Sequence, residues 1–157
     1  MKLNIALLLL TLCSAAAAQS SNAYVYFSPG GVTASGQTAG SIQFGGGGEK
    51  ILWKGIGLGA ELGAWGPTQN FSYALGVFSP NVSYHFIHDR TRKFDPYVTG
   101  GYTLFFRGAT ENLFNFGVGA NYWFSHAVGM KFEFRDQVYP QNGGAHFLGA
   151  RVGVTFR

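Results

Sequence analysis

A chain of 157 residues is long enough for one domain, but only 11% of its residues are charged, against roughly a quarter in an average soluble domain. Such a composition leaves too few charges to cover a water-facing surface, and 17% of the residues are aromatic. The formal net charge of +4 argues little for nucleic-acid binding, because outside Arg90–Lys93 the basic residues stand singly.

The N-terminal segment predicts a secretory signal peptide. Lys2 gives a positive start, and Ile5–Leu12 forms an apolar core that is too short to cross a bilayer as a helix. Small residues follow, and cleavage is expected after Ala18. Removal of residues 1–18 would leave residues 19–157 as a single exported domain, which implies the general secretory route.

Cys13 allows a second interpretation of this segment, in which the protein is a lipoprotein acylated at that cysteine. Leu12 stands where a small residue is expected before such a cysteine, so cleavage after Ala18 is favoured. Cys13 is the only cysteine in the chain, and the exported domain is therefore expected to contain no disulfide.

The rest of the chain is divided into strand-like stretches by Gly, Pro, Ser, Thr and Asn clusters, and it lacks helical periodicity. No later segment has the run of about 18 apolar residues that a transmembrane helix needs. Eight strands are predicted: Ala23–Phe27, Ala39–Leu52, Gly55–Trp65, Phe71–Phe86, Pro96–Arg107, Leu113–Phe124, Ala127–Val138 and Ala145–Phe156.

Most of these stretches alternate between an apolar and a mixed face. In Leu113–Phe124, the residues Phe114 and Phe116 alternate with Asn115 and Gly117. The first half of Phe71–Phe86 is out of phase with its second half, and Pro80 predicts a β-bulge there.

The connections also alternate. Those after the second, fourth and sixth strands are short or strongly turn-like, whereas those after the odd-numbered strands are rich in Gly, Pro, Ser, Thr and Asn, as in Ser28–Thr38. In a meander, odd and even connections lie at opposite ends. We therefore expect a "turn end" with tight turns and a "loop end" with long loops, as in outer-membrane barrels.

The composition of the two faces decides which one is inside. The mixed face is mainly Gly, Ser, Thr and Asn with a few charges of both signs, which suits a narrow interior better than a water-exposed surface. The other face is almost free of charge, as hydrocarbon requires, except for Lys50 and Asp136, which are expected near an interface. A soluble exported lipid binder, with the apolar face inside, is the alternative.

Several features together resemble the small eight-stranded outer-membrane β-barrel family of the OmpA/OmpX type. They are the signal peptide, the eight alternating strands, the ending "RVGVTFR" and the stretch "FDPYVTGGYTLFFR" at Phe94–Arg107. The resemblance implies an all-β fold, an eight-stranded antiparallel up-and-down transmembrane β-barrel. It also implies a monomer in the outer membrane of a Gram-negative-type bacterium. The partners that it implies are outer-membrane lipid or lipopolysaccharide, and the barrel-assembly machinery, which would recognise the C-terminal strand near Phe156.

Charged residues on the mixed face predict an ion-pair network in the lumen, because buried charges are costly unless they are paired. A structural plug is the favoured interpretation, since eight strands leave little open cross-section, and a small-solute pore is the alternative. The predicted members are Glu49, Glu61, His85, Arg107, Lys131, Glu133, Arg135 and Arg151.

Aromatic residues near the strand ends predict interfacial girdles at the two membrane surfaces. The predicted members are Trp53, Trp65, Phe71, Tyr122, Trp123, Phe124, Tyr139 and Phe156.

A catalytic site is not predicted. A lipid A-modifying enzyme would need a His, a Ser and a carboxylate near the outer rim, whereas His146 is the one histidine expected at the loop end and has no serine beside it in its strand. The "GGGGE" stretch at Gly45–Glu49 lacks the Lys-Ser/Thr and the helix of a phosphate loop. No metal, cofactor or nucleic acid is expected, and the sequence favours a non-enzymatic structural or surface-interaction role.

Overall fold

The computed structural model describes residues 21–87, 89, 91–140 and 144–157. The predicted signal peptide, its cleavage site and Cys13 lie outside the described residues. Within them are eight strands and one short 3-10 helix. The elements are β1 (Ser21–Ala34), β2 (Gln37–Trp53), β3 (Ile56–Pro67), η1 (Phe71–Tyr73), β4 (Leu75–His85), β5 (Phe94–Arg107), β6 (Ala109–Trp123), β7 (Val128–Tyr139) and β8 (Ala145–Phe156).

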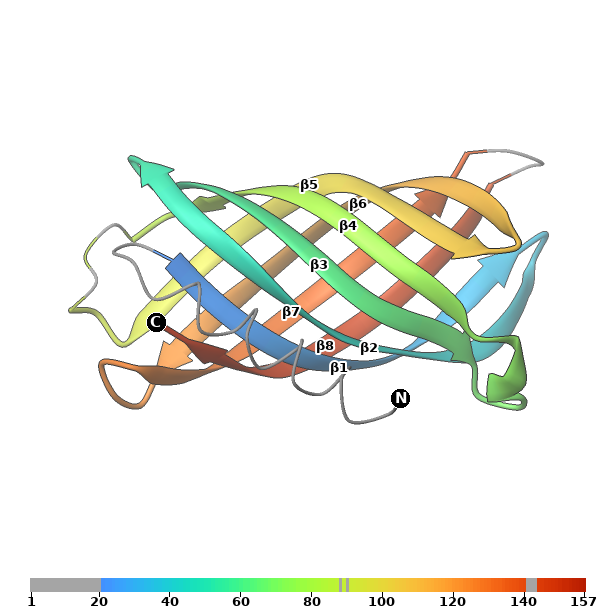
Figure 1. Ribbon diagram of the computed structural model, residues 1–157, viewed down its shortest axis with the longest axis horizontal. Helices are drawn as coiled ribbons and strands as arrows, with labels where there is room; N and C mark the ends of the chain where they lie inside the picture. Colours follow the sequence, from blue (N-terminus) through green and yellow to red (C-terminus); the bar gives the residue numbers. More distant parts are fainter. Residues whose placement is uncertain (1–20, 88, 90, 141–143) are drawn as a thin grey trace.

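The strands form a closed antiparallel up-and-down barrel (Figure 1). Each strand pairs with its neighbours in the sequence, and β8 pairs with β1 over Ala23↔Phe156 to Ala34↔Ala145. Closure leaves no strand edge without a partner, which is the condition for a sheet to cross a bilayer. The predicted all-β, eight-stranded fold is confirmed. The described residues contain no helix that is both long and apolar enough to cross a membrane.

The alternation along each strand separates an apolar exterior from a polar interior. In β6, Phe114, Phe116 and Val118 are 61%, 57% and 57% exposed, whereas Asn115 and Asn121 are 3% and 1% exposed. Apolar residues cover the outside in the other strands too, for example at Phe134. A soluble barrel would show the reverse arrangement, so the expected lipid-binder alternative is wrong.

The expected contrast in connection length between the two ends is not observed. At the loop end, β1 and β2 are joined by Ser35 and Gly36 alone, and β5 and β6 by Gly108. At the turn end, the β4–β5 connection runs over 86–93. Residues such as Pro29, which lie in the stretch predicted as a loop, still pair with the neighbouring strand. Turns with positive φ at Gly36 and Gly108 then close the hairpins.

Pro80 does not mark a bulge. The registers of β4 with β3 and with β5 run through this position unshifted, and the inward positions alternate regularly from Val77 to His85. The strand looked out of phase because Val77 is an apolar residue that points into the lumen, where it is fully buried. The first part of the predicted stretch is the helix η1, so β4 begins at Leu75.

Candidate functional site

The centre of the lumen is organised around the carboxylate of Glu61, which is 1% exposed. Its Oε2 accepts hydrogen bonds from Nη1 of Arg135 at 2.9 Å and from Nη1 of Arg151 at 2.8 Å. Its Oε1 accepts a hydrogen bond from the Tyr24 hydroxyl at 2.8 Å. These residues come from β3, β7, β8 and β1, so one carboxylate links four strands across the barrel.

A second carboxylate, that of Glu133, extends this cluster. Its Oε2 accepts a hydrogen bond from the Tyr97 hydroxyl at 2.7 Å, and its Oε1 forms ion pairs with Arg135 and Arg151. Lys131 lies 3.8 Å from Glu133, and its Nζ stands over two aromatic rings, 4.5 Å from the centre of Tyr24 and 4.0 Å from that of Tyr97. The buried charges are thus paired or face aromatic rings, which offsets their loss of hydration.

His85 organises the lumen at the turn end. Its Nδ1 lies 2.9 Å from both carboxylate oxygens of Asp95, and its Nε2 lies 3.1 Å from Oε2 of Glu49. The Ser83 hydroxyl also donates to Glu49, and the His85 ring stacks on Tyr97 with centroids 5.2 Å apart. Because both ring nitrogens face carboxylates, no nitrogen is left to activate a nucleophile.

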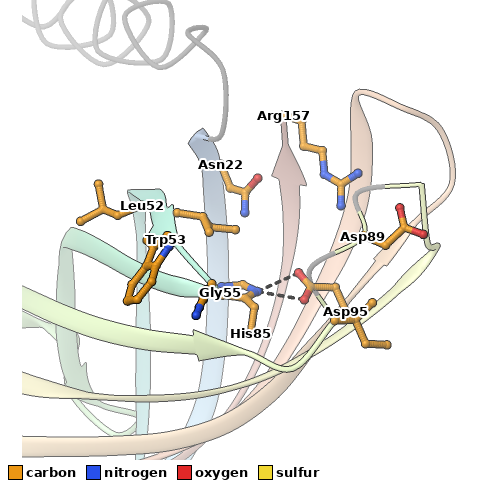
Figure 2. A pocket seen from close by; sticks show the side chains of 11 residues that line it. Asn22, Leu52, Trp53, Gly55, His85, Asp89, Asp95 and Arg157 are labelled. Carbon is orange, nitrogen blue, oxygen red and sulfur yellow. Dashed lines mark hydrogen bonds and ion pairs between the residues drawn. The ribbon is translucent and has the colours of Figure 1, made fainter.

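This histidine forms the floor of a pocket of about 250 Å³ in the turn-end mouth of the barrel (Figure 2). Figure 2 shows Arg157 and Asp89 at the rim and the His85–Asp95 pair below them. Asp89 accepts hydrogen bonds from the backbone N–H and the hydroxyl of Thr91, which lower the pKa of the Asp89 carboxyl.

The loop end of the lumen contains uncharged layers. Gln137 donates to Gln43 at 2.7 Å, and Gln43 donates to the Tyr26 hydroxyl at 2.9 Å. Beyond them lies a mainly apolar cap, in which Trp65 packs against Phe105 and Phe147 with centroids 5.6 and 5.3 Å away. The cap consists of Trp65, Leu75, Val77, Phe105, Leu113, Tyr139 and Phe147.

Inward glycines make room for this filling. A Cβ at Gly47 would lie 2.9 Å from Cγ of Glu61 and 3.1 Å from Cζ of Tyr24, and one at Gly119 would lie 2.6 Å from the Tyr97 hydroxyl. Real side chains do not tolerate such distances. The "GGGGE" stretch is therefore a strand whose inward position leaves space for the central carboxylate.

The structure places seven of the eight predicted network residues in the lumen, at Glu49, Glu61, His85, Lys131, Glu133, Arg135 and Arg151. It does not place Arg107 there. Arg107 is the last residue of β5 and is exposed, because the strand has left the barrel interior at the loop end.

Sequence reasoning missed Asp95 and the tyrosines that bind the carboxylates. Asp95 lies two residues before Tyr97 in β5, so the two side chains point to the same side of the sheet. The predicted strand Pro96–Arg107 began one residue too late to include Asp95. The extra residues of the network are Tyr24, Tyr26, Asp95 and Tyr97.

Five of the predicted interfacial aromatics lie on the exterior near strand ends or in η1: Trp53, Phe71, Tyr122, Phe124 and Phe156. The other three point inward, so their prediction is wrong. Trp65 and Tyr139 pack in or against the apolar cap, and Trp123 is 2% exposed with the Arg157 guanidinium 3.7 Å from its ring centre. Each lies an even number of residues from a lumen residue in the same strand, as Trp65 does from Glu61, and therefore points to the same side of the sheet.

The loop end carries one histidine–carboxylate pair. Nδ1 of His146 lies 2.7 Å from Oδ2 of Asp136, and the His146 side chain is 52% exposed. In the described part of the chain, no serine hydroxyl is hydrogen-bonded to this ring, and no group of three or more His, Cys, Asp and Glu residues is arranged to hold a metal ion. The contact gives a hydrogen-bonding partner to the one acidic residue that the apolar face carries in β7.

Comparison with known proteins finds similarity in structure. No family model and no curated protein sequence matches the chain. The N-terminal β-barrel domain of OprF from Pseudomonas aeruginosa superposes with a TM-score of 0.64 at 20% identity, over 88% of this chain and 97% of that one. The chain has the fold of the small eight-stranded outer-membrane β-barrels.

Two further barrels of this fold are similarly close. Neisserial surface protein A superposes with a TM-score of 0.69 at 12% identity, over 88% of this chain and 97% of that chain. Ail, the attachment invasion locus protein of Yersinia pestis, gives 0.59 at 9% identity, over 87% and 96%. The resemblance of the sequence to small outer-membrane barrels is thereby confirmed at the level of the fold.

Proposed function

We propose that this protein is a non-enzymatic integral outer-membrane barrel that stabilises the cell envelope and interacts at its surface, with a lumen closed to solutes. We further propose that it is a monomer in the outer membrane of a Gram-negative-type bacterium, in contact with lipid or lipopolysaccharide. It is exported by the general secretory route, and the barrel-assembly machinery recognises it through β8. The apolar exterior and the shared fold support the membrane location.

Successive layers of packed side chains along the lumen support its closure. From the turn end inward, the layers are the His85 cluster, the ion pairs of Glu61 and Glu133, and the Gln43–Gln137 layer. The apolar cap completes the filling at the loop end. An ion crossing this lumen would have to displace buried side chains that are bound to one another, and eight strands offer little space for that movement.

A planar-bilayer recording tests this proposal. The wild-type protein should give no steady single-channel openings, whereas a variant with a small side chain in each layer, His85→Ala/Arg135→Ala/Gln137→Ala/Phe147→Ala, should show openings. The replacement of an exterior aromatic residue, Phe134→Ala, is the matched control and should remain silent. Steady wild-type openings would favour the small-solute pore instead.

The alternative of a lipid A-modifying enzyme has partial support from the Asp136–His146 pair at the loop end. Mass spectrometry of lipid A from cells that express the protein tests it. We expect the same lipid A species with and without expression, and a new species that disappears with His146→Ala would establish the enzyme.

A further inference from the structure

The two ends of the barrel differ sharply in charge outside the lumen. Among the described residues, the loop end carries Arg107 together with the acids Glu111 and Asp136. At the turn end, the described residues outside the lumen include a single acid, Asp89, and five cations. These are Lys50, Lys54, Arg92, Lys93 and Arg157. The basic character of the chain is therefore concentrated on the rim where the C-terminus lies (Figure 1).

Four of these cations are exposed. They are called the turn-end cation belt and consist of Lys50, Lys54, Arg92 and Lys93. Nζ of Lys54 lies 4.4 Å from the ring centre of Trp53, whose side chain is 66% exposed on the outside. Lys93 directly precedes Phe94, another exposed aromatic residue. The belt thus follows the aromatic border of the apolar surface, where lipid headgroups lie.

Among the described residues, no strong ion pair neutralises the charges of the belt. Nε of Arg92 lies 3.8 Å from Oδ2 of Asp89, but the two side chains are 70% and 53% exposed, and such surface pairs are weak. Lys54 faces a ring rather than a carboxylate. These cations can therefore bind an external anion.

A shallow hollow of about 410 Å³ lies beside Lys50 on the outer surface. Gly48 and Ala60, which pair directly across β2 and β3, line it together with Leu58, Gly59 and the polar residues Ser21, Asn22, Glu49 and Lys50. The small or apolar side chains at Gly48, Ala60 and Leu58 suit an acyl chain. Lys50, at the turn-end edge of the hollow, is placed to meet the phosphate of the same lipid.

We propose that the turn-end cation belt binds the headgroups of anionic phospholipids, and that the hollow beside Lys50 seats one such lipid. Cations next to an apolar surface bind anionic headgroups by electrostatic attraction, which falls off within a Debye length. The inference rests on the proposed membrane location. It adds a lipid class, and it places the binding at the end that carries the C-terminus.

The aromatic residues offer a direct test. Of the three tryptophans, Trp65 and Trp123 point inward, whereas Trp53 is exposed and lines the edge of the turn-end pocket, so Trp53 is the one expected to meet lipid. The protein is folded into phosphatidylcholine vesicles in which an equal, small fraction of the lipid is brominated phosphatidylglycerol or brominated phosphatidylcholine. Bromine quenches tryptophan on contact, so the ratio of quenching measures lipid preference at Trp53.

We expect several-fold stronger quenching by the anionic lipid, a preference that falls at high salt. The variant Lys50→Gln/Lys54→Gln/Arg92→Gln/Lys93→Gln should quench equally with both lipids, and the loop-end control Arg107→Gln should keep the wild-type ratio. Equal quenching in the wild type, or an unchanged ratio in the fourfold variant, would overturn the lipid preference alone. Absence of quenching by both lipids would overturn the membrane location as well.

Discussion

At the scale of single residues, the lumen depends on a few side chains with several partners each. Glu61 is the clearest case, because its carboxylate receives two guanidinium groups and a phenol in a buried setting. Isolated charges in such surroundings are costly, so removal of the Glu61 charge would leave both Arg135 and Arg151 without one of their carboxylate partners.

Glu61→Gln should therefore lower the free energy of unfolding by about 3–5 kcal/mol, because it leaves buried Arg135 and Arg151 with one carboxylate fewer. Urea titration of the vesicle-inserted protein, followed by heat-modifiable gel mobility, measures this change. Glu111→Gln, at an exposed loop-end position, should change it by less than about 0.5 kcal/mol. Equal losses in both variants would contradict the role given to Glu61.

Adjacent glycines in β2 should respond differently to the same methyl group. Gly47→Ala places its Cβ 2.9 Å from Glu61 and 2.7 Å from a backbone oxygen, and we expect a loss of about 1–3 kcal/mol from overpacking. Gly48→Ala points outward, with its nearest neighbour at 3.7 Å, and should be tolerated. The same urea titration compares the two, and a tolerated Gly47→Ala would show that the lumen is not tightly filled.

At the scale of elements, the alternation of inward and outward residues along each strand accounts for most of what the sequence predicts. The errors lie at positions where residue type and this alternation disagree. Alternation predicts the strands and their two faces, as Leu113–Phe124 shows, and the composition of the faces predicts which one is inside. Residues near strand ends were harder to assign. The cluster Pro29, Gly30 and Gly31 reads as a turn, but pairing with β2 and β8 keeps it in β1.

The contacts of the candidate site could be predicted only in part. Alternation identifies which charges face inward, but it does not say which strands meet across the lumen, so the bonds of Glu61 to Arg135 and Arg151 emerge only from the closed barrel. Similarly, Trp65 and Trp123 look like interfacial residues by type. Their positions in the alternation place them inside, so residue type alone is misleading at these two positions.

The exterior of β7 offers a test of the membrane interpretation. Phe134 lies near the middle of the strand and is 66% exposed, and Phe134→Arg should cost about 2–4 kcal/mol if it faces hydrocarbon. Phe94→Arg, at the turn-end start of β5, should cost about 0–1 kcal/mol, because charges are tolerated near the interface. Unfolding from vesicles measures both. In a water-exposed barrel neither change would be costly.

At the scale of the whole molecule, stability depends on the pairing of the first strand with the last. Val25 of β1 and Val154 of β8 pair directly and both face outward. Cysteines at directly paired positions are close enough to form a disulfide, whereas strands several positions apart in a sheet are not.

Val25→Cys/Val154→Cys should therefore cross-link on oxidation after folding, and the boiled, unreduced chain should migrate faster than the reduced one. Val25→Cys/Val118→Cys, which joins β1 to the non-adjacent β6, should not cross-link. The mature chain is expected to have no other cysteine to interfere. Failure of the first pair to cross-link would mean that the barrel does not close as described.

The hairpin of β1 and β2 ends in a two-residue turn, and its outermost residues still pair with β8 through Ala34↔Ala145. A peptide inserted between Ser35 and Gly36 would consequently be held at the end of a hairpin that is paired on both sides, and its position would be restricted. Antibodies that recognise this turn would bind a conformational epitope, and heating the antigen should abolish their recognition.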